Sequence, residues 1–414
     1  MAIAHSSRPS AFPTPGGVKM SGPLHGITVI DLTRVLAGPF CTMLLADMGA
    51  EVIKIERPEG GDDTRSFGPF LNGESAYFMS INRGKKSMKL NLKTPTGKKI
   101  LLDLVKKADV VVENFKPGVM NKLGLGYSTL SKINQRLIFA ASSGFGQTGP
   151  YSERPAYDLI IQGMSGMMSI TGPDAKTPTR TGSSIADIVS GVFTVVGILS
   201  ALYAREKTGR GQMVDVAMLD CMVAILENAI TRFVVGGKNP EPIGNRHPSI
   251  APFTTFPTAD GSINIACGND DLWKKFCNLT ELEPLAEDPR FVTNPDRVKN
   301  WVALEPILQK AMRKRGTDEW LKHLQAGGIP SGPINKMEQV MQDPQVIARE
   351  MLVELTHPVG GPVRIPGFPI KFSENPVKLE VPAPTLGQHT TEILSKVLGL
   401  STKAIEELRG QKVI

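Results

Sequence analysis

The sequence predicts an α/β protein built on a parallel sheet. Between residues 26 and 219, β-rich and helical segments alternate, which is typical of a sheet covered by helices on both faces. Around residue 235 the pattern changes to VGGKNPEPIGNRHPSIAPF, which is rich in Gly and Pro, and a smaller unit of strands and helices follows. A chain of 414 residues is also long enough for two or three domains, at roughly 150 residues each.

Six β-rich runs are expected to form this sheet, with helices between them. The helix over 94–108 carries the clearest signals, because Thr94 is an N-cap residue and Pro95 suits the first helical position. Lysines in its last turn complement the helix dipole. The expected strands are 26–33, 51–57, 87–92, 109–115, 136–143 and 213–219, and the other main helices are 37–50 and 75–82.

The longest uncharged run, 188–204, has 17 residues and lies between Asp187 and Arg205. That is shorter than the roughly 20 apolar residues needed to cross a bilayer, so we expect a helix buried in the protein core and no membrane partner. The N-terminal residues 1–22 have no apolar segment of signal-peptide length and are expected to form a disordered leader, with Met20 as an alternative start.

Charge and cysteine content point to a cytoplasmic protein with an anionic ligand. The formal net charge is +7, and the lysines are spread along the chain, so a nucleic-acid partner is not expected. The four cysteines are far apart and form no C-x-x-C pair, which predicts reduced thiols. No Cys/His cluster of zinc type exists in the sequence, so no metal site is predicted.

Cationic residues recur where the expected strands end. Arg34 follows the first strand, Arg57 ends the second and Lys93 follows the third, while the fourth ends in Asn114, Phe115 and Lys116. Ligands of open parallel sheets bind beyond the carboxyl ends of the strands. These side chains therefore predict a polyanionic ligand at this edge, such as a nucleotide carrying several phosphates.

The run SGFGQTGPY contains a literal G-x-G-x-x-G at Gly144, Gly146 and Gly149, the fingerprint of dinucleotide-binding dehydrogenases. In that motif the third glycine lies in a helix whose N-terminal amides hold the pyrophosphate. Here Pro150 follows Gly149 at once, and Pro155 comes soon after. The helix is therefore not expected, and an NAD(P)-dependent dehydrogenase is only a distant alternative.

Two aspartates are candidates for chemistry. Asp187 stands at the start of the most apolar helix, where a carboxylate either caps the helix and meets its dipole or acts as a nucleophile beside a cleft. Asp158 follows Tyr157 in PAYDLIIQG and is a possible second acid. The residues alone leave these alternatives open.

Six ordered motifs resemble the class III CoA-transferases, the family of the formyl-CoA:oxalate and crotonobetaine CoA-transferases. The resemblance covers roughly residues 22–414. The motifs are LTRVLAGPFCTMLLADMGAEVIKIERPEGGDDTR, TPTGKKILLDLVKKADVVVENFKPGVMNKLGLGY, SGFGQTGPY, TGRGQMVDVAMLD, GIPSGPIN and LGQHTTEIL.

The resemblance implies that Asp187 is the catalytic residue, which attacks the donor thioester and then carries CoA as an aspartyl thioester. CoA or acyl-CoA is implied as a substrate, with no tightly bound cofactor. Lys122 stands where the formyl-CoA relative has arginine, which keeps the charge and loses the bidentate fork. The implied CoA contacts are Leu36, Ala37, Arg57, Leu90, Lys93, Asn114, Phe115, Lys116, Lys122, Tyr157 and Asp158.

The motifs look most like transferases that move CoA from succinyl-CoA to a dicarboxylic acid such as glutarate, and Arg34 is the expected partner of the distal carboxylate. His247 is a further substrate candidate. The segment GNRHPSIAPF replaces the glycine-rich flap of the formyl-CoA relative, which argues against oxalate. The α-methylacyl-CoA racemases of the same family carry His where this chain has Tyr157, a poor base near neutral pH, so racemase is the second reading.

The family fold implies a Rossmann-like large domain and a small α+β domain joined by two linkers, with two ring-shaped chains interlocked in a homodimer. A non-catalytic CoA-binding protein is the alternative outside enzymes, and it would not depend on Asp187. The expected segments are a leader 1–22, the large domain 23–225, a linker 226–245, the small domain 246–325, a linker 326–345 and a C-terminal segment 346–414 that returns to the large domain.

Overall fold

The computed structural model describes residues 22–414, so the predicted leader lies almost entirely outside the described residues. The chain divides into two compact units. The first unit contains residues up to Met167 together with Thr181–Glu227 and Pro344–Ile414, and the second contains Met168–Arg180 and Asn228–Asp343. The short stretch Met168–Arg180, which lies within the predicted large domain, thus belongs to the second unit.

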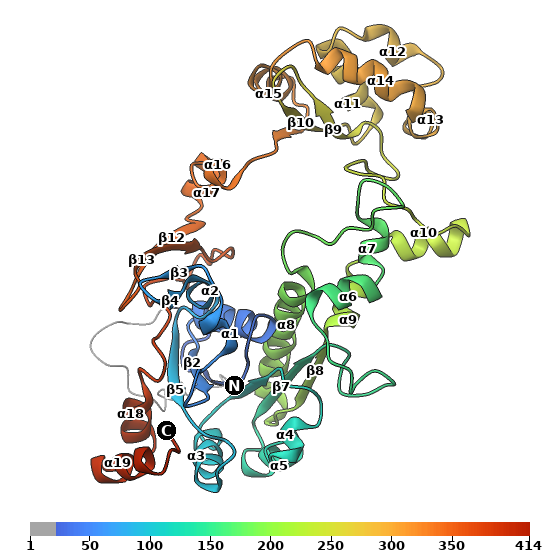
Figure 1. Ribbon diagram of the computed structural model, residues 1–414. Coiled ribbons are helices and arrows are strands. Elements are labelled where there is room, and N and C mark those ends of the chain that lie inside the picture. The colour runs from blue at the N-terminus through green and yellow to red at the C-terminus, as the bar shows by residue number, and fades with distance from the viewer. Residues whose placement is uncertain (1–21) are drawn as a thin grey trace, which may run out of the picture. The chain divides into compact units, whose positions relative to one another are not determined.

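A six-stranded, fully parallel sheet forms the centre of the first unit (Figure 1). Its strand order is β5-β2-β1-β6-β7-β8, so the chain starts in the middle, winds to one edge and then returns to wind to the other. Ligands of such doubly wound sheets bind where the winding reverses, which here is between β1 and β6. The strands are β1 Thr28–Asp31, β2 Glu51–Glu56, β5 Lys85–Lys89, β6 Val110–Glu113, β7 Ile138–Ser143 and β8 Met213–Ala217.

Each face of this sheet packs against its own hydrophobic core, as the predicted doubly covered sheet requires. One core contains strand residues such as Val29 and Val112 together with side chains of α1 (Ala37–Asp47) and α8 (Ile185–Thr208). The other core contains the alternate strand residues Ile30 and Val111 and the helices α3 Pro95–Val105, α4 Val119–Lys122, α5 Tyr127–Ile133 and α19 Thr402–Gly410.

The remaining elements of the first unit lie at the ends of the sheet and along the C-terminal segment (Figure 1). They are η1 Asp63–Ser66, β3 Phe70–Leu71, β4 Glu74–Ser75, α2 Ala76–Ile81, α6 Asp158–Met164, α9 Met218–Ala224, α17 Pro344–Ala348, β12 Leu352–His357, β13 Gly361–Pro366, α18 Thr390–Glu392 and a π-helical turn Ile393–Val397. The helix α7, Met167–Ile170, begins at the boundary between the units.

Helix α8 extends beyond the uncharged run in both directions, and one of its faces is not buried. The buried face packs on α1 and the sheet, whereas Val192, Val196 and Tyr203 are exposed. The expected core helix thus packs in the core along one face, while its other face is exposed in the single chain. By length and composition alone, α8 is the one helix of the described chain that passes as a candidate membrane span.

A glycine lets α8 approach α1 closely. A Cβ atom at Gly191 would lie only 2.8 Å from the carbonyl oxygen of Ala37, so a side chain at this position requires the two helices to separate. Residues four apart lie on the same face of a helix, so Asp187 lies on the same side of α8 as Gly191, one turn closer to the helix start. The start of α8 is in this way positioned beside the start of α1.

The second unit is built on a three-stranded antiparallel sheet with the order β11-β10-β9. Its core holds three tryptophans, and the buried Arg297 beside them donates to the carbonyls of Ala251, Phe291 and Val292 and pairs with Asp270 at 2.6 Å. The elements are α10 Ala229–Gly236, β9 Phe253–Pro257, β10 Ser262–Ala266, α11 Asp270–Leu279, α12 Glu283–Glu287, α13 Asn294–Lys299, α14 Trp301–Met312, α15 Thr317–Ala326, β11 Ser331–Pro333 and α16 Met337–Val340.

Three local predictions need correction. The third strand occupies Lys85–Lys89 rather than 87–92. Its first residue, Lys85, is buried in an ion pair with the distant Asp31, and the sequence around Lys85 does not indicate this burial. Residues 226–245, predicted as a linker, contain helix α10, and residues 326–345 contain β11, an edge strand that tolerates Gly and Pro. The absence of a helix directly after Gly149 is confirmed, since α6 begins only at Asp158.

Candidate active site

The connection from β1 to α1 is held in an unusual backbone conformation. Val35 has φ +68°, a left-handed value that is rare for a β-branched residue and costs free energy unless its surroundings enforce it. Asn114 at the end of β6 clamps the preceding residue, accepting from the Arg34 N–H at 2.9 Å and donating to the Arg34 carbonyl at 2.7 Å. The ends of the two strands at the reversal point of the sheet are thereby joined by hydrogen bonds between the Asn114 side chain and the main chain of Arg34.

A buried ion network lies beneath this connection. Asp31, at the end of β1, accepts from the backbone N–H of Thr33 at 2.8 Å and pairs with Lys85 at 3.1 Å. Lys54 of β2 donates to the carbonyl of Thr33 at 2.8 Å. The side chains of Asp31, Lys54 and Lys85 are fully buried. Burial opposes the charge of Lys85 and lowers its pKa to about 8, with Asp31 acting in the opposite direction.

Asp62 connects this network to Val35. One carboxylate oxygen accepts from the Val35 N–H at 3.2 Å and from Thr64, and the other pairs with Lys54 at 2.8 Å. Burial opposes the charge of Asp62, but Lys54 and the Thr64 hydrogen bonds outweigh it and lower the pKa to about 2. The left-handed residue is thus held by a carboxylate that stays ionised.

A cleft of about 740 Å³ opens above the carboxyl ends of β1, β2, β5 and β6. Two predicted cations, Arg34 and Arg57, line it and share Asp63, at 3.4 Å and 2.7 Å. The Arg34 guanidinium also lies 5.9 Å from the centre of the Phe115 ring. The lining includes Arg34, Arg57, Leu90, Lys93 and Phe115 of the predicted site, and also Lys89, Arg409 and Lys412.

Several other predicted contacts lie beside this cleft rather than in its wall. Lys116 and Lys122 are exposed and are not among its lining residues. Leu36 and Ala37 are buried and lead from Arg34 into α1. Buried Glu113 accepts from the Phe115 N–H at 2.8 Å and so holds the backbone that carries this ring.

Asp187 lies in the first turn of α8, whose N-cap residue Ser184 makes no side-chain cap. Within residues 22–414, no hydrogen bond to its carboxylate is found. Burial and the neighbouring charge of Asp158 raise the pKa of Asp187 to about 7. An aspartate that is partly protonated near neutral pH, beside the start of another helix, is a functional-site candidate on physical grounds.

Asp158 is buried and holds the start of α8. Its carboxylate accepts from the Ala186 N–H at 2.9 Å and from the Gln162 amide at 2.8 Å. Gln162 in turn accepts from the N–H of Thr181 at 3.0 Å. Asp158 therefore positions the helix that carries Asp187, while the neighbouring Tyr157 is 73% exposed.

Tyr77 of α2 was not found by the sequence reasoning. Burial raises its pKa, and the charges of Asp187, Asp62 and Asp158 add to this effect. Its ring packs edge-on against Phe67, with 5.8 Å between centroids. A phenol close to three carboxylates belongs to the same site, but no motif in its surrounding sequence, ESAYFMS, indicates this.

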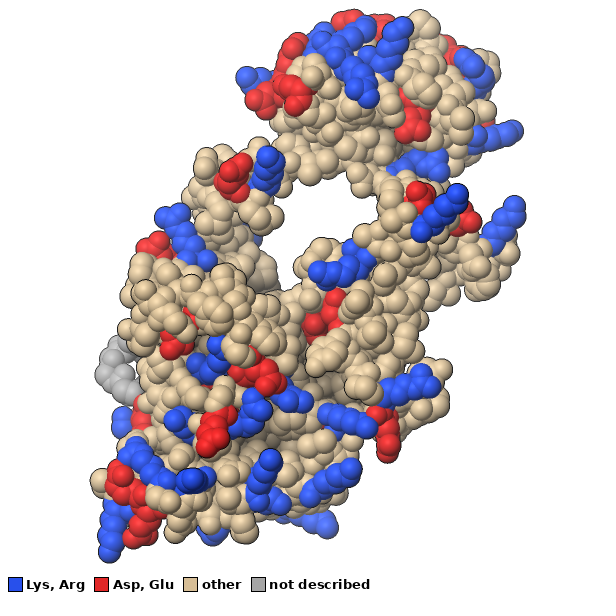
Figure 2. Space-filling view, in the orientation of Figure 1, with Lys and Arg blue, Asp and Glu red and all other residues tan. Residues whose placement is uncertain are grey.

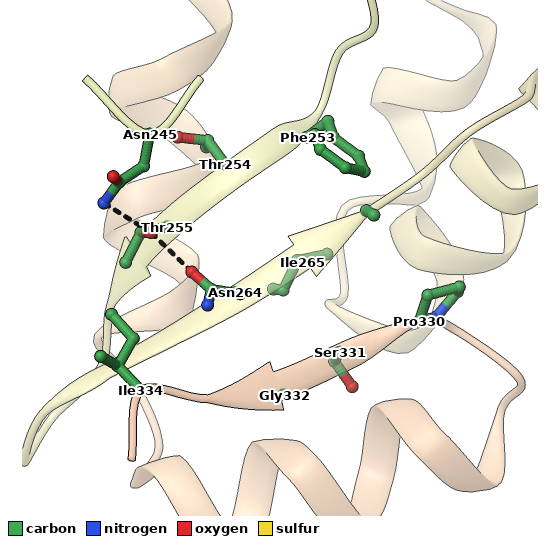
Figure 3. Close-up of a pocket in the computed structure, with 11 residues that line it drawn as sticks. Asn245, Phe253, Thr254, Thr255, Asn264, Ile265, Pro330, Ser331, Gly332 and Ile334 are labelled. Atoms are coloured by element: carbon green, nitrogen blue, oxygen red, sulfur yellow. Dashed lines mark hydrogen bonds between the residues drawn. The ribbon is translucent and has the colours of Figure 1, made fainter. Parts of the chain in front are cut away.

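The second unit has a separate concave surface on the open face of its sheet, with a volume of about 610 Å³ (Figure 3). Asn245 donates to Thr255 at 2.9 Å, and Thr255 donates to Asn264 at 2.6 Å. Its lining residues include no titratable side chain, so they offer no general acid or base for chemistry. His247 also belongs to this unit, where it accepts from Ser249 and packs edge-on against Phe253.

Among the described residues 22–414, no group of three or more His, Cys, Asp or Glu side chains is placed to hold a metal ion. The four cysteines are free and buried. Burial raises the pKa of Cys41, Cys221, Cys267 and Cys277, which makes the reactive thiolate scarce. The carboxylates at the starts of α6 and α8 are thus the strongest candidates for nucleophilic chemistry in the first unit.

Comparison with known proteins identifies the family. The model of CoA-transferase family III matches residues 24–390. The chain belongs to this family. Both the resemblance predicted from the motifs and the assignment as a class III CoA-transferase are confirmed by this match and by the relatives.

Three comparisons span most of the chain. It is 49% identical over 356 residues to an acetyl-CoA:oxalate CoA-transferase of Acetobacter aceti, covering 86% of this chain and 90% of the relative. It is 40% identical over 393 residues to a human succinyl-CoA:glutarate CoA-transferase, covering 95% and 90%. A crystal structure of a CaiB/BaiF family protein from Brucella suis matches with a TM-score of 0.81 and 42% identity, covering 91% and 100%.

The network beneath the β1–α1 connection makes a testable contribution to stability. Asp62→Asn leaves Lys54 without this buried partner, and we expect the free energy of unfolding to fall by about 3 kcal/mol at pH 7. Because the pKa of Asp62 is about 2 in the folded protein against an ordinary 3.8, its contribution is complete above pH 4 and is lost as the pH falls toward 2. The difference between the two proteins should therefore shrink over that interval.

Urea unfolding followed by circular dichroism at pH 7, 4 and 2.5 measures this difference. Asp63→Asn is the matched control, since the neighbouring carboxylate is partly exposed and its loss is expected to cost at most about 1 kcal/mol. Equal effects of the two substitutions, or a gap that widens in acid, would show that Asp62 does not hold the connection in this way.

Proposed function

We propose that this enzyme transfers CoA from an acyl-CoA, with succinyl-CoA as the donor, to a dicarboxylic acid, and that Asp187 is its nucleophile. The observation that carries the proposal is the position of Asp187, with a raised pKa, in the first turn of α8, one turn before the close approach of Gly191 to Ala37 of α1. The segment 33–37 runs from there directly into the wall of the cationic cleft. A carboxylate and a site for a polyanion thus belong to one connected region of the first unit.

The proposed reaction conserves the thioester by passing through covalent intermediates. The Asp187 carboxylate attacks the donor thioester carbonyl, the C–S bond breaks, and CoA thiolate leaves an acyl-aspartyl anhydride. The thiolate then attacks the aspartyl carbonyl, which releases the donor acid and forms an aspartyl-CoA thioester. The acceptor carboxylate attacks this thioester, which expels the thiolate and forms a second aspartyl anhydride. The thiolate then attacks the acceptor's carbonyl in this anhydride, and the C–O bond breaks to give the new acyl-CoA and free Asp187.

The cleft supplies the groups that an acyl-CoA requires. Arg57 and Lys93 are suited to the phosphates, and Phe115 and Leu90 offer apolar surface to the nucleotide or the pantetheine arm. Arg57 now pairs with Asp63, so a phosphate would replace that carboxylate as its partner. We assign Leu36 and Ala37 to the thioester end, because they follow the cleft and begin α1. Asn114 holds the backbone of Arg34 and so positions the start of the β1–α1 connection. Lys116 and Lys122 are assigned to CoA only by resemblance.

A dicarboxylic acceptor is supported by the relatives, whose names include both oxalate and glutarate. The relative at 49% identity is named for oxalate, so oxalate is a candidate acceptor here although the glycine-rich flap is absent. Arg34 is half exposed at the cleft and near Phe115, and it remains the proposed partner of the distal carboxylate. The donor is proposed as succinyl-CoA, with acetyl-CoA as the other candidate that the relatives suggest.

The alternatives are less well supported. An α-methylacyl-CoA racemase needs a second base beside Asp187, and the position in question holds Tyr157, which is largely exposed. Asp158 already accepts two hydrogen bonds from neighbouring groups. A dehydrogenase needs a helix directly after Gly149, whereas the next helix, α6, begins only at Asp158. A binding protein without activity does not account for the raised pKa of Asp187.

We also propose that the chain works as a cytoplasmic homodimer, as the family resemblance implies. Support comes from the outer faces of α6 and α8, where apolar side chains are exposed in a way that is unusual for a monomer. These side chains are Leu159, Ile160, Met164, Val192, Phe193, Val196 and Tyr203.

Brief exposure of the protein to succinyl-CoA should trap the intermediate. We expect the intact mass to increase by a CoA or succinyl adduct, and peptide mapping to place the adduct on Asp187. The Asp187→Ala variant should show no adduct and no transfer to glutarate or oxalate while keeping its circular dichroism spectrum. An adduct that persists in this variant, or exchange of the α-proton of a 2-methylacyl-CoA without any transfer, would overturn the proposal.

The pKa of the nucleophile predicts the pH profile. Attack requires the ionised carboxylate, so log(kcat/KM) for succinyl-CoA should rise with pH and level off above about 7. In Asp158→Asn the neighbouring negative charge is gone, and the inflection should move to lower pH, whereas the remaining side-chain oxygen still accepts from the Ala186 N–H. An inflection at the same pH in both proteins would contradict the electrostatic coupling.

Arg34→Ala tests the recognition of the acceptor. We expect a fall of about 100-fold in kcat/KM for glutarate and a change below threefold for valerate, which has the same chain length and one carboxylate, since a charge-assisted contact contributes on the order of 2–3 kcal/mol. Arg57→Ala is the control and should lower both rates together by weakening acyl-CoA binding. Equal losses for glutarate and valerate in Arg34→Ala would exclude the assigned role.

A further inference from the structure

The last residues of the chain are firmly built into the first unit. Ile405 and Leu408 of α19 and Val413 beyond it are buried in the core that also contains α3. Lys412 between them has φ +55°, and this left-handed turn directs Val413 back into the core. The segment 402–414 therefore has a defined place beside the sheet.

Asn91, just after β5, joins this segment to the cleft. Its backbone N–H donates to the carbonyl of Val413 at 2.8 Å, and its side-chain amide lies 3.5 Å from the carbonyl of Lys412. Its side-chain oxygen accepts from the N–H of Lys93 at 3.1 Å. One residue thus places two lysines, more than three hundred positions apart in sequence, at the same end of the cleft.

These two lysines differ from the arginines of the cleft, and they are more exposed than Lys89, the lysine of β5 that also lines it. Arg34 and Arg57 pair with Asp63, and Arg409 pairs with Glu406 and donates to Thr391 at 2.6 Å. Lys93 and Lys412 are exposed, and in the part of the chain that the structure describes neither makes an ion pair. In Figure 2, Lys and Arg side chains are numerous over this part of the unit, around α3, α18 and α19.

We propose that Lys412, together with Lys93, binds the 3′-phosphate of the CoA ribose. This inference rests on the proposed function, because it takes CoA as the substrate. Asp187 and α1 mark the thioester end. In the sheet β2 lies next to β1, whereas β5 is the edge strand. Arg57, at the end of β2, is therefore nearer to the thioester end than Lys93, which follows β5. The diphosphate then meets Arg57, and the phosphomonoester beyond it meets the exposed ammonium groups of Lys93 and Lys412.

Physical chemistry favours this assignment. A phosphomonoester carries nearly two negative charges at neutral pH, more than either phosphate of a diphosphate diester linkage, and it gains most from two compact ammonium groups. Lysines without partners bind it without first giving up an ion pair, whereas Arg57 must release Asp63. The C-terminal segment therefore serves to distinguish CoA from its analogue without the 3′-phosphate.

Titration calorimetry with CoA and with 3′-dephospho-CoA tests the assignment on the full chain. For the unmodified protein we expect CoA to bind at least tenfold more tightly than the dephospho analogue. Lys412→Gln should weaken CoA binding about tenfold, the size of one charge-assisted contact, and leave the analogue within twofold. Lys403→Gln, an equally exposed lysine of α19 that does not line the cleft, is the matched control and should change neither affinity.

Parallel losses for both ligands in Lys412→Gln, or no loss for either, would overturn the assignment of Lys412, as would equal binding of CoA and its analogue by the unmodified protein. Thermal unfolding of the variant shows whether the segment 402–414 is still in place. The Asp187→Ala variant separates this inference from the proposed function, since it should be inactive and yet keep the full preference for CoA. An active protein without the preference would refute only the 3′-phosphate site, and a protein that binds neither ligand would refute both.

Discussion

The buried ion network of Asp31, Lys54 and Lys85 is the constraint on which the candidate site depends. Without partners these charges would be very costly in the interior, so the network exists only with all of its members in place. Its polar atoms hold the backbone of Thr33, and Asp62 holds that of Val35. The strain of a left-handed valine is thereby maintained at the point where the chain passes from the cationic cleft to α1.

The strand order brings contacts from two neighbouring strands to the β1–α1 connection. Because β1 lies between β2 and β6, the connection after it receives contacts from both neighbours, Lys54 on one side and Asn114 on the other. The same order places the ends of four strands around one cleft. The close crossing at Gly191 then adds the start of α8, so residues from five parts of the sequence meet without any of them being adjacent along the chain.

Much of this arrangement is predictable from sequence, and the failures have a common cause. Apolar alternation and caps identify the strands and helices of the first unit, and the rule for parallel sheets places Arg34, Arg57 and Lys93 at one edge. What local patterns miss depends on distant partners. Lys85 looks like a surface residue until Asp31 neutralises it, the edge strand over Ser331–Pro333 looks like a linker until β10 pairs with it, and nothing near Lys412 indicates that Asn91 brings it to the cleft.

The two aspartates at the helix starts show how one fold gives similar groups different tasks. Asp158 uses both oxygens to accept hydrogen bonds and is fixed by Ala186 and Gln162, so its charge is tied to structure. Asp187 is one residue beyond the amide that Asp158 occupies, and in residues 22–414 it has no such partner. Burial raises the pKa of Asp187, and the negative charge of Asp158 raises it further. Fixing the helix and activating its carboxylate are therefore two consequences of the same side chain, because the group that orders the start of α8 also makes the ionised form of Asp187 less stable and more reactive.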